Sequence, residues 1–299
     1  MTKEERFKNW WPLLVMIIPG ILFFLLFRYI PLLGSVVAFK DYSVFRGVWS
    51  SPWVGFRNFE VLFRSTDFMR ILSNTLILAF FNLLFTFPMA IILALMLNEL
   101  RVGAFKKGIQ TILTIPHFFS WVIIAGLTFS FFSRTGLFNI VRSWAGLDYY
   151  LVMQEEKHFR VVYVLTALWR DAGWNTIVYL AAMSAIDPQL YESAMVDGAS
   201  RFRQIISITL PLILPTIIIM FLLRIGNFLV LGFDHVYNLL TPMTYSVGDI
   251  IDTFVFRVGL QNARYSYATA LGMFQSVVGF ILVMGCNALS RKITEEGLW

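Results

Sequence analysis

The sequence is poor in the residues that disulfides, metal sites and many active sites require. Its 299 residues include one cysteine, Cys286, and three histidines, His117, His158 and His235, which lie in different segments. A single cysteine excludes a disulfide framework, and its apolar surroundings favour a small packing residue. Each histidine would need further ligands to hold a metal ion. We therefore predict no metal site and no cofactor bound by this chain.

Familiar catalytic motifs are also missing. The sequence contains no HExxH, GxSxG or CxxC pattern. It has no GxxxxGK[ST] loop to hold nucleotide phosphates, so the chain does not itself hydrolyse ATP by a P-loop. We therefore predict that the protein is not an enzyme, and this includes the enzymes that work within a membrane.

Charged residues are also scarce in this sequence. Charged residues make up 14% of the chain, against roughly 25% in soluble domains. Hydrophobic residues make up 58%, with thirty phenylalanines and nine tryptophans, which suits lipid-facing and interfacial surfaces. The net charge of +6 comes from basic residues that lie mostly beside apolar runs, so it indicates membrane topology and no nucleic-acid partner. The composition predicts an all-α, polytopic membrane protein.

Six apolar runs are long enough to cross a bilayer, since a helical span needs about 20 mainly apolar residues. They cover residues 11–37, 74–97, 109–132, 161–185, 208–231 and 268–289. The first run is too long for the core of a signal peptide, so we expect it to remain as the first span. We predict a single transmembrane domain over residues 1–299, with Pro116 kinking the third span near its start.

Basic residues predict the orientation of these spans. Six spans place both termini on one side, together with the loops after the second and fourth spans. The basic residues of this side are Lys3, Arg6, Lys8, Arg101, Lys106, Lys107, Arg201, Arg203, Arg291 and Lys292. The opposite loops carry about as many basic residues over more than twice the length. The positive-inside rule therefore places the termini and residues 187–207 in the cytoplasm.

The segment 187–215 interrupts two apolar runs and carries clear helix signals. Asp187-Pro188 is a helix start, with an N-cap carboxylate before a proline at the first helical position. Gly198 is a natural helix end, and Ser200 is suited to cap a second helix. We predict two short helices joined at a glycine, which form a rigid projection that another protein moves.

A spaced motif lies within this projection. Its residues are, in order, Glu192, Ser193, Ala194, Gly198, Ile208, Leu210 and Pro211, with three residues before the glycine and nine after it. The pattern resembles the EAA loop of ABC importer permeases. The longer run that starts with Asp197-Gly198-Ala199 resembles the carbohydrate branch of that family, the group of the maltose permeases. Ser193 departs from the usual alanine but is nearly as small.

The resemblance extends over the whole chain. In the fourth span it rests on Trp169 and Gly173 ahead of Leu180. In the last span and the tail it rests on residues 265–270, Gln275 and the end Gly297-Leu298-Trp299. These segments are similar to permeases that import larger glycans and polysaccharide fragments.

The resemblance implies the type I ABC importer permease fold, in which this chain is the non-catalytic transmembrane subunit in a bacterial plasma membrane. It implies a second, different permease, two cytoplasmic ATPase subunits that bind ATP and Mg²⁺, and a lipid-anchored or periplasmic protein that delivers the sugar. The projection would enter a cleft on an ATPase subunit, with Glu192 as the polar anchor. The implied coupling residues are Glu192, Ser193, Ala194, Asp197, Gly198, Ala199, Leu210 and Pro211.

Ionisable residues inside the fourth span suggest a place for the sugar path, because such groups are costly in a membrane and usually face the protein interior. Asp171 shares a helix face with Asn175, and Arg170 has the spacing to stack on Trp174. Aromatic rings with amides or carboxylates are suited to hold sugars. The candidates for the path are Trp169, Asp171, Trp174 and Asn175, with Asp234, Tyr237, Asn82 and His235 as weaker ones.

Two alternatives stay open. Asp171 has an equally good structural interpretation, as an ion pair with Arg170 or Arg224 that holds helices together. The whole chain has the alternative of a secondary transporter or channel for a small polar solute. That class also has apolar spans with internal charges, but it needs no EAA projection and works without ATP.

Overall fold

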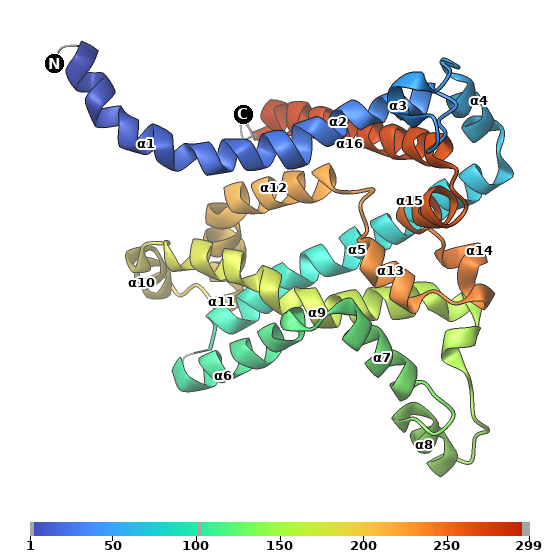
Figure 1. Cartoon of the computed structure of the whole chain (residues 1–299). Helices are drawn as coiled ribbons and strands as arrows, with labels where there is room; N and C mark the ends of the chain where they lie inside the picture. The colour runs from blue at the N-terminus through green and yellow to red at the C-terminus, as the bar shows by residue number, and fades with distance from the viewer. Residues whose placement is uncertain (1–2, 101–102, 295–299) are drawn as a thin grey trace. The chain divides into compact units, whose positions relative to one another are not determined.

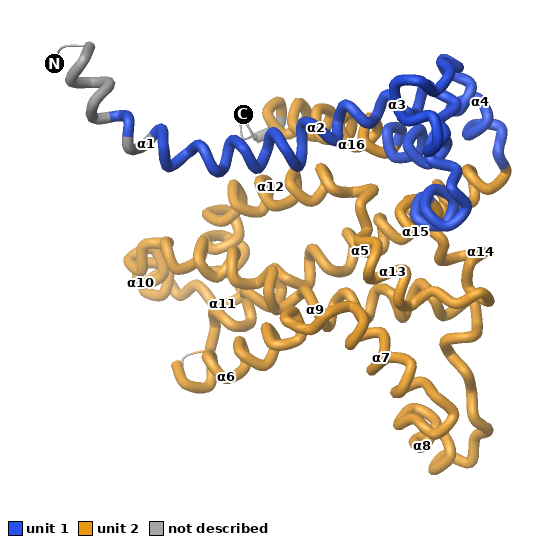
Figure 2. The backbone as a smooth tube through the Cα atoms, viewed as in Figure 1, with its two compact units in different colours: residues 1–65, 255–274 blue, residues 66–254, 275–299 orange. Residues whose placement is uncertain are grey.

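The computed structural model describes residues 3–100 and 103–294. This part of the chain is almost entirely helical, and its one isolated β-bridge joins Lys40 to Trp53. Two compact units are distinguished by colour in Figure 2. The first contains residues 1–65 and 255–274, and the second contains residues 66–254 and 275–299.

The first unit begins with a long, interrupted helical segment. It consists of α1 (Lys3–Phe24), a π turn (Leu25–Tyr29), α2 (Ile30–Leu33) and a 3-10 turn (Gly34–Phe39). Pro31 explains the wide π turn, because its ring would clash with the carbonyl four residues earlier in a regular helix. All side chains from residue 14 to residue 33 are exposed, as expected of an apolar helix that faces lipid or a partner chain.

The rest of the first unit is made of short elements. They are α3 (Gly47–Ser50), α4 (Arg57–Arg64), a π turn (Phe256–Gln261) and the beginning of α16 (Tyr265–Thr294). Phe39 packs against Trp53, Phe56 and Phe59, with ring centroids 5.7, 5.3 and 5.4 Å away. This aromatic cluster fixes the loop that follows the first span.

The second unit is centred on α5 (Thr66–Asn98) and α9 (Glu156–Ser184), which lie side by side (Figure 1). The buried face of α5 combines large apolar residues with three alanines and four polar residues, which are Asn74, Thr75, Asn82 and Thr86. Its exposed positions are large and apolar, such as Phe80, Leu84 and Ile92. This distribution is typical of membrane helices, in which small residues allow close packing and polar ones bond across helices.

The predicted third span is broken where the sequence predicts only a kink. α6 (Gly103–Thr114), a 3-10 turn (Ile115–Phe118) and α7 (Trp121–Phe131) form a pair bent by 101°. Pro116 lies in the turn, and the Ser120 side chain caps α7 by accepting from the Ile123 N–H at 3.4 Å. A new N-cap starts a new helix direction, which explains why the bend is so large.

The remaining elements of the second unit include segments predicted as loops. They are α8 (Leu137–Trp144), a 3-10 turn (Val152–Gln154), α13 (Phe233–Leu239), a 3-10 turn (Pro242–Thr244), α14 (Tyr245–Gly248) and α15 (Ile251–Val255). They are too short to give an apolar run of the length that marks a span. The second unit also contains α10 (Pro188–Val196), α11 (Arg201–Gln204), a π turn (Ile205–Thr209), α12 (Leu210–Gly226) and the part of α16 from residue 275 onward.

By length and composition, four described helical segments are able to cross a membrane, or five with the bent pair. The four are Leu14–Phe39, Thr66–Asn98, Arg201–Gly226 and Tyr265–Lys292. The predicted fourth span falls on α9, which has 29 residues and a length of about 43 Å but is more polar than the others. Six spans therefore stay a prediction. Arg101 and Gly297-Leu298-Trp299 lie outside the described residues.

Candidate functional site

The segment 187–199 forms the predicted first helix of the projection. The Asp187 side chain accepts from the Gln189 N–H at 2.9 Å, and Pro188 occupies the first helical position of α10. At the other end, the Gly198 N–H donates to the Met195 carbonyl at 3.1 Å and the Ala199 N–H donates to the Ala194 carbonyl at 2.8 Å. This pair of bonds is a Schellman motif. It needs the left-handed φ of +77° that Gly198 adopts.

The second helix of the projection differs from the prediction because it does not end before the fifth span. Ser200 caps α11 as expected, by accepting from the Arg203 N–H at 3.4 Å. The chain then passes through the π turn Ile205–Thr209 into α12, so that residues 201–226 form one continuous helical segment. Pro211 follows the π turn, which accommodates its ring. A force on α11 is therefore transmitted directly to α12.

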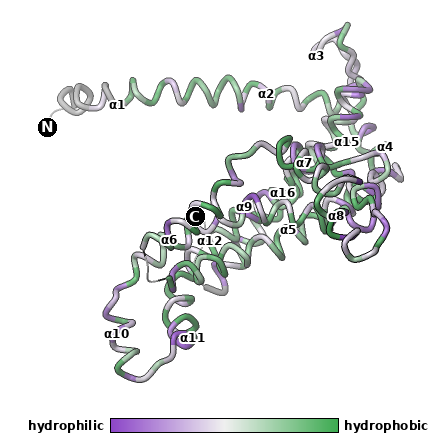
Figure 3. Tube along the Cα trace, turned by 90° about the horizontal axis from the view of Figure 1, so that it is seen from below, coloured by the Kyte–Doolittle hydropathy of each residue, from purple (hydrophilic) through white to green (hydrophobic). Residues whose placement is uncertain are grey.

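Three side-chain contacts hold the projection in place. The Tyr191 hydroxyl bonds to the Thr209 hydroxyl at 2.9 Å, which ties α10 to the π turn. Arg201 pairs with Glu99 at 3.1 Å, just after the end of α5. Gln204 donates to the Ala199 carbonyl at 2.9 Å, across the turn between the helices. The two helices therefore form a rigid unit, located at one end of the second unit (Figure 3).

The surface of the projection is mostly open. None of the described residues of α10 is buried, and Val196 and Phe202 are 88% and 72% exposed. Glu192 is exposed, whereas Ala194 and Ala199 are half-buried. The Ser193 hydroxyl donates to the Leu190 carbonyl at 3.1 Å, so this departure from alanine adds no unpaired donor to the surface. Exposed apolar side chains grouped with a carboxylate are typical of an interaction surface.

A second cluster surrounds Asp171 in the middle of α9. Its carboxylate accepts from Arg170 at 2.8 Å and lies 3.1 Å from His117 Nδ1 in the turn between α6 and α7. The Trp174 indole stacks on His117 with ring centroids 4.4 Å apart. The expected stacking of Arg170 on Trp174 is wrong, because Arg170 instead lies over Trp121, 4.5 Å from the ring centroid.

The Arg170 contact leads to a buried histidine. The Trp121 ring stacks on the imidazole of His235, which belongs to α13, with ring centroids 3.5 Å apart. Tyr163 stacks on the same imidazole with ring centroids 4.3 Å apart. His235 Nε2 lies 2.9 Å from the Thr166 hydroxyl. That hydroxyl already donates to a backbone carbonyl at 2.9 Å, so the imidazole N–H is the donor in this bond. Burial, with a smaller contribution from Arg170, lowers the pKa of His235 well below its ordinary value of 6.5.

The third polar group joins α5, α9 and α12. Asn82 donates to the Tyr163 hydroxyl at 3.1 Å, and its side-chain oxygen accepts from Arg224. Beside this group is a cavity of about 210 Å³. Its lining includes Thr86, Asn175, Tyr179, Arg224 and Asn227. This is an arrangement of amides, hydroxyls and one guanidinium that can bond to a neutral polar ligand.

The structure thus divides the predicted path residues among different places. Asp171 and Trp174 meet at His117, whereas Asn175 lines the cavity with Arg224. Trp169 is 48% exposed beside Phe119. On α13, Asp234 and Tyr237 are exposed, while His235 between them is buried. No group of three or more potential metal ligands occurs among the described residues.

Sequence reasoning missed most of the partners in these clusters. His117, Trp121, Tyr163 and Thr166 were not candidates for the site. One signal was present in the sequence, since Tyr163, Thr166 and Arg170 follow one another at spacings of three and four and so share a helix face. The partners on other helices have no such signal.

We expect the stability of the folded protein to fall as the pH falls below 6.5. The folded state holds His235 neutral, whereas the unfolded chain takes up a proton near pH 6.5, so acid favours the unfolded state by at most about 1.4 kcal/mol per pH unit. The melting temperature of the purified protein between pH 7.5 and 5.5 is the measurement. His235→Gln should lower the melting temperature at pH 7.5 but reduce its pH dependence, and an unchanged slope would contradict the assignment.

Comparisons with known proteins agree with this geometry. Residues 68–295 match the family described as binding-protein-dependent transport system inner membrane component. Protein LplB of Bacillus subtilis (strain 168) is 46% identical over 96% of this chain and 91% of its own length. The polygalacturonan/rhamnogalacturonan transport system permease protein YteP of the same organism is 47% identical, over 96% and 90%.

A solved structure has the same fold along its whole length. It is the crystal structure of a bacterial ABC transporter involved in the import of the acidic polysaccharide alginate. One of its chains matches with a TM-score of 0.90 and 45% identity, over 97% of this chain and 98% of that chain. The chain described here therefore belongs to the family of binding-protein-dependent inner membrane components, the non-catalytic transport subunits of ABC transporters.

Proposed function

We propose that this chain is the transmembrane permease subunit of a carbohydrate importer driven by separate ATPase subunits. Together with a second, different permease it forms the path for an oligosaccharide or glycan that an external binding protein delivers. The similarity to YteP and to the alginate transporter supports this substrate class. A related crystal structure holds a periplasmic protein bound to an alginate pentasaccharide, which supports delivery by a binding protein. The proposed location is a bacterial plasma membrane with both termini in the cytoplasm.

The observation that carries the proposal is the exposed projection formed by α10, Gly198 and α11. It is rigid, it presents Glu192 and apolar side chains without burying them, and it continues directly into α12. Such a surface suits insertion into a cleft on an ATPase subunit. Within the projection, Asp197, Gly198 and Ala199 form the turn, while Leu210 and Pro211 start the helix that would be moved. ATP and Mg²⁺ would bind only to the partner subunits.

For the sugar path, the contacts favour the cavity beside Arg224 over the Asp171 cluster. Asn175 and Arg224 line an open space of about 210 Å³. Asp171 is engaged by both Arg170 and His117, which supports the structural interpretation of this carboxylate. Trp174 is likewise held against His117.

The assignment of Asp171 to a structural cluster and of Asn175 to the path predicts opposite effects of their substitution on stability and on sugar uptake. Asp171→Asn should lower stability by about 1–3 kcal/mol, since it weakens the bonds to Arg170 and His117, and should leave the uptake rate per folded complex near normal. Asn175→Ala should keep stability but reduce uptake several-fold. Melting temperature and sugar uptake in proteoliposomes test both. Loss of uptake in a fully stable Asp171→Asn complex would instead place Asp171 in the path.

The proposed function is tested by co-purification and transport. Gentle solubilisation should bring along an ATPase and a second permease, and the reconstituted complex should import oligosaccharide only with ATP and binding protein. The alternative is a secondary transporter or channel. Uptake by this chain alone, without ATP, would support that alternative.

A further inference from the structure

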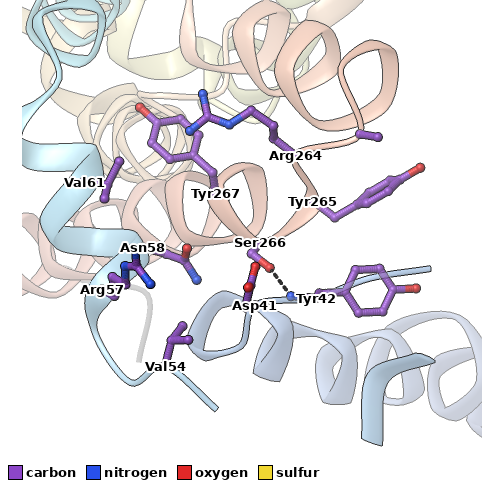
Figure 4. Close-up of a pocket in the computed structure, with 11 residues that line it drawn as sticks. Asp41, Tyr42, Val54, Arg57, Asn58, Val61, Arg264, Tyr265, Ser266 and Tyr267 are labelled. Atoms are coloured by element: carbon purple, nitrogen blue, oxygen red, sulfur yellow. Dashed lines mark hydrogen bonds between the residues drawn. The ribbon is translucent and has the colours of Figure 1, made fainter. Parts of the chain in front are cut away.

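A polar pocket lies within the first unit, away from the projection in sequence and outside the proposed path. It has a volume of about 350 Å³ and is formed by two distant stretches, residues 41–61 and 263–267 (Figure 4). The first stretch follows the first predicted span, and the second leads into the last one. The predicted topology therefore places the pocket on the external side, where substrate arrives.

Contacts between the two stretches hold the pocket together. The Tyr42 backbone N–H donates to the Ser266 hydroxyl at 3.0 Å, shown as the dashed line in Figure 4. The rings of Tyr42 and Tyr265 meet edge to face at 5.7 Å. On the opposite side, Asn58 donates to the carbonyls of Ala38 and Lys40 at 2.8 and 3.0 Å. The pocket is thus built by the fold and is not a gap between mobile loops.

Within the described part of the chain, the charged side chains of the pocket are not paired with one another or with other charged groups. Among the described residues, neither Arg57 nor Arg264 forms an ion pair, and the Asp41 carboxylate has no hydrogen-bond partner. The Arg264 guanidinium lies over the Tyr267 ring, 4.7 Å from its centroid. A guanidinium placed over a ring still has N–H groups at its edge, which can bind a carboxylate in two-point fashion.

We propose that this pocket binds a carboxylated sugar residue, a uronate, of an acidic oligosaccharide before it enters the path. Arg57 and Arg264 both pair with carboxylate groups of the ligand, Asp41 accepts from a sugar hydroxyl, and the tyrosines contact the ring. The volume falls in the range of about 300–1,000 Å³ typical of small-molecule sites, whereas protein docking uses broad surfaces of about 800 Å² per partner. This inference rests on the proposed import of carbohydrate and adds a substrate class and a second site.

The test compares an acidic ligand with its neutral counterpart on the intact complex. Trigalacturonate and the same trisaccharide with its carboxyls reduced are titrated, without binding protein, onto the permease–ATPase complex in lipid nanodiscs. Trigalacturonate should bind more tightly to the native complex. Arg57→Gln and Arg264→Gln should each weaken trigalacturonate binding about tenfold, as expected for loss of one charge-assisted bond, with little change for the neutral ligand. Arg46→Gln, an exposed arginine of the same unit outside the pocket, is the matched control.

Three outcomes would overturn the inference. One is equal binding of the two ligands to the native complex, and another is equal weakening by the Arg46→Gln control. The third requires a separate titration of the unliganded binding protein onto the same complexes. If the pocket variants bind trigalacturonate normally and lose affinity only for that protein, the pocket serves protein docking. Failure of the proposed function would look different, since the native complex would then import neither sugar with ATP.

Discussion

Glu192→Lys is expected to leave the permease folded in the membrane but to reduce sugar uptake at least tenfold. Glu192 is exposed, and its side chain has no hydrogen-bond or ion-pair partner among the described residues, so its replacement removes no internal polar contact of that side chain. In the proposed complex it faces a basic group of the ATPase. Placing like charges together at an interface costs several kcal/mol, and each 1.4 kcal/mol is about a factor of ten in affinity.

Two measurements separate this effect from misfolding. The amount of ATPase that co-purifies with the permease reports attachment, and sugar-stimulated ATP hydrolysis reports coupling. Glu156→Lys is the control, since Glu156 is an exposed acid in the first turn of α9, at the end opposite to the projection. It should retain normal attachment and coupling. Normal sugar-stimulated hydrolysis in the Glu192→Lys complex would count against the assignment of the projection.

Gly173→Ala is expected to have the largest effect on folding. A Cβ at Gly173 would lie 2.1 Å from the carbonyl oxygen of Leu113 and 2.5 Å from its carbonyl carbon. These are backbone atoms of α6, so relief requires that α6 and α9 move apart. Overpacking of this kind costs about 1–3 kcal/mol when side chains yield, and we expect about 3 kcal/mol or more here because the backbone has to yield.

The melting temperature and the yield of monodisperse protein measure this effect. Gly108→Ala is the matched control, because Gly108 is on α6 itself and a Cβ there meets nothing within 4 Å. It should be neutral or stabilise the helix by up to about 1 kcal/mol. A Gly173→Ala protein that melts at the native temperature would show that the two helices do not approach so closely in the membrane.

The Gly173 contact also explains the position of the Asp171 cluster. The backbones of α6 and α9 touch at Leu113 and Gly173, and the turn that carries His117 starts two residues after Leu113. His117 therefore reaches both Asp171 and Trp174. Even a methyl group at residue 173 would displace this turn, so we expect the cluster to loosen along with the helix pair.

Local chemistry allowed the sequence to predict the projection. An N-cap, a proline at the first helical position and a glycine at the helix end act on neighbouring backbone groups, and Asp187, Pro188, Gly198 and Ser200 all have these predicted roles. Apolar length likewise predicted the spans that fall on α5 and α16. The break after Pro116 was underestimated, because its size depends on the new cap at Ser120 and on the packing of α7.

The sequence by itself therefore determined the helical membrane class, the apolar runs and the capped turns of the projection, since these depend on residues close together in the chain. Only the tertiary structure decided that Arg170 lies over Trp121, that Asp171 meets His117 and that Asn175 shares a cavity with Arg224. It also decided the pocket between residues 41–61 and 263–267. The physical reason is that helix spacing fixes which face a residue occupies, whereas the partner on that face is fixed by how separate helices pack.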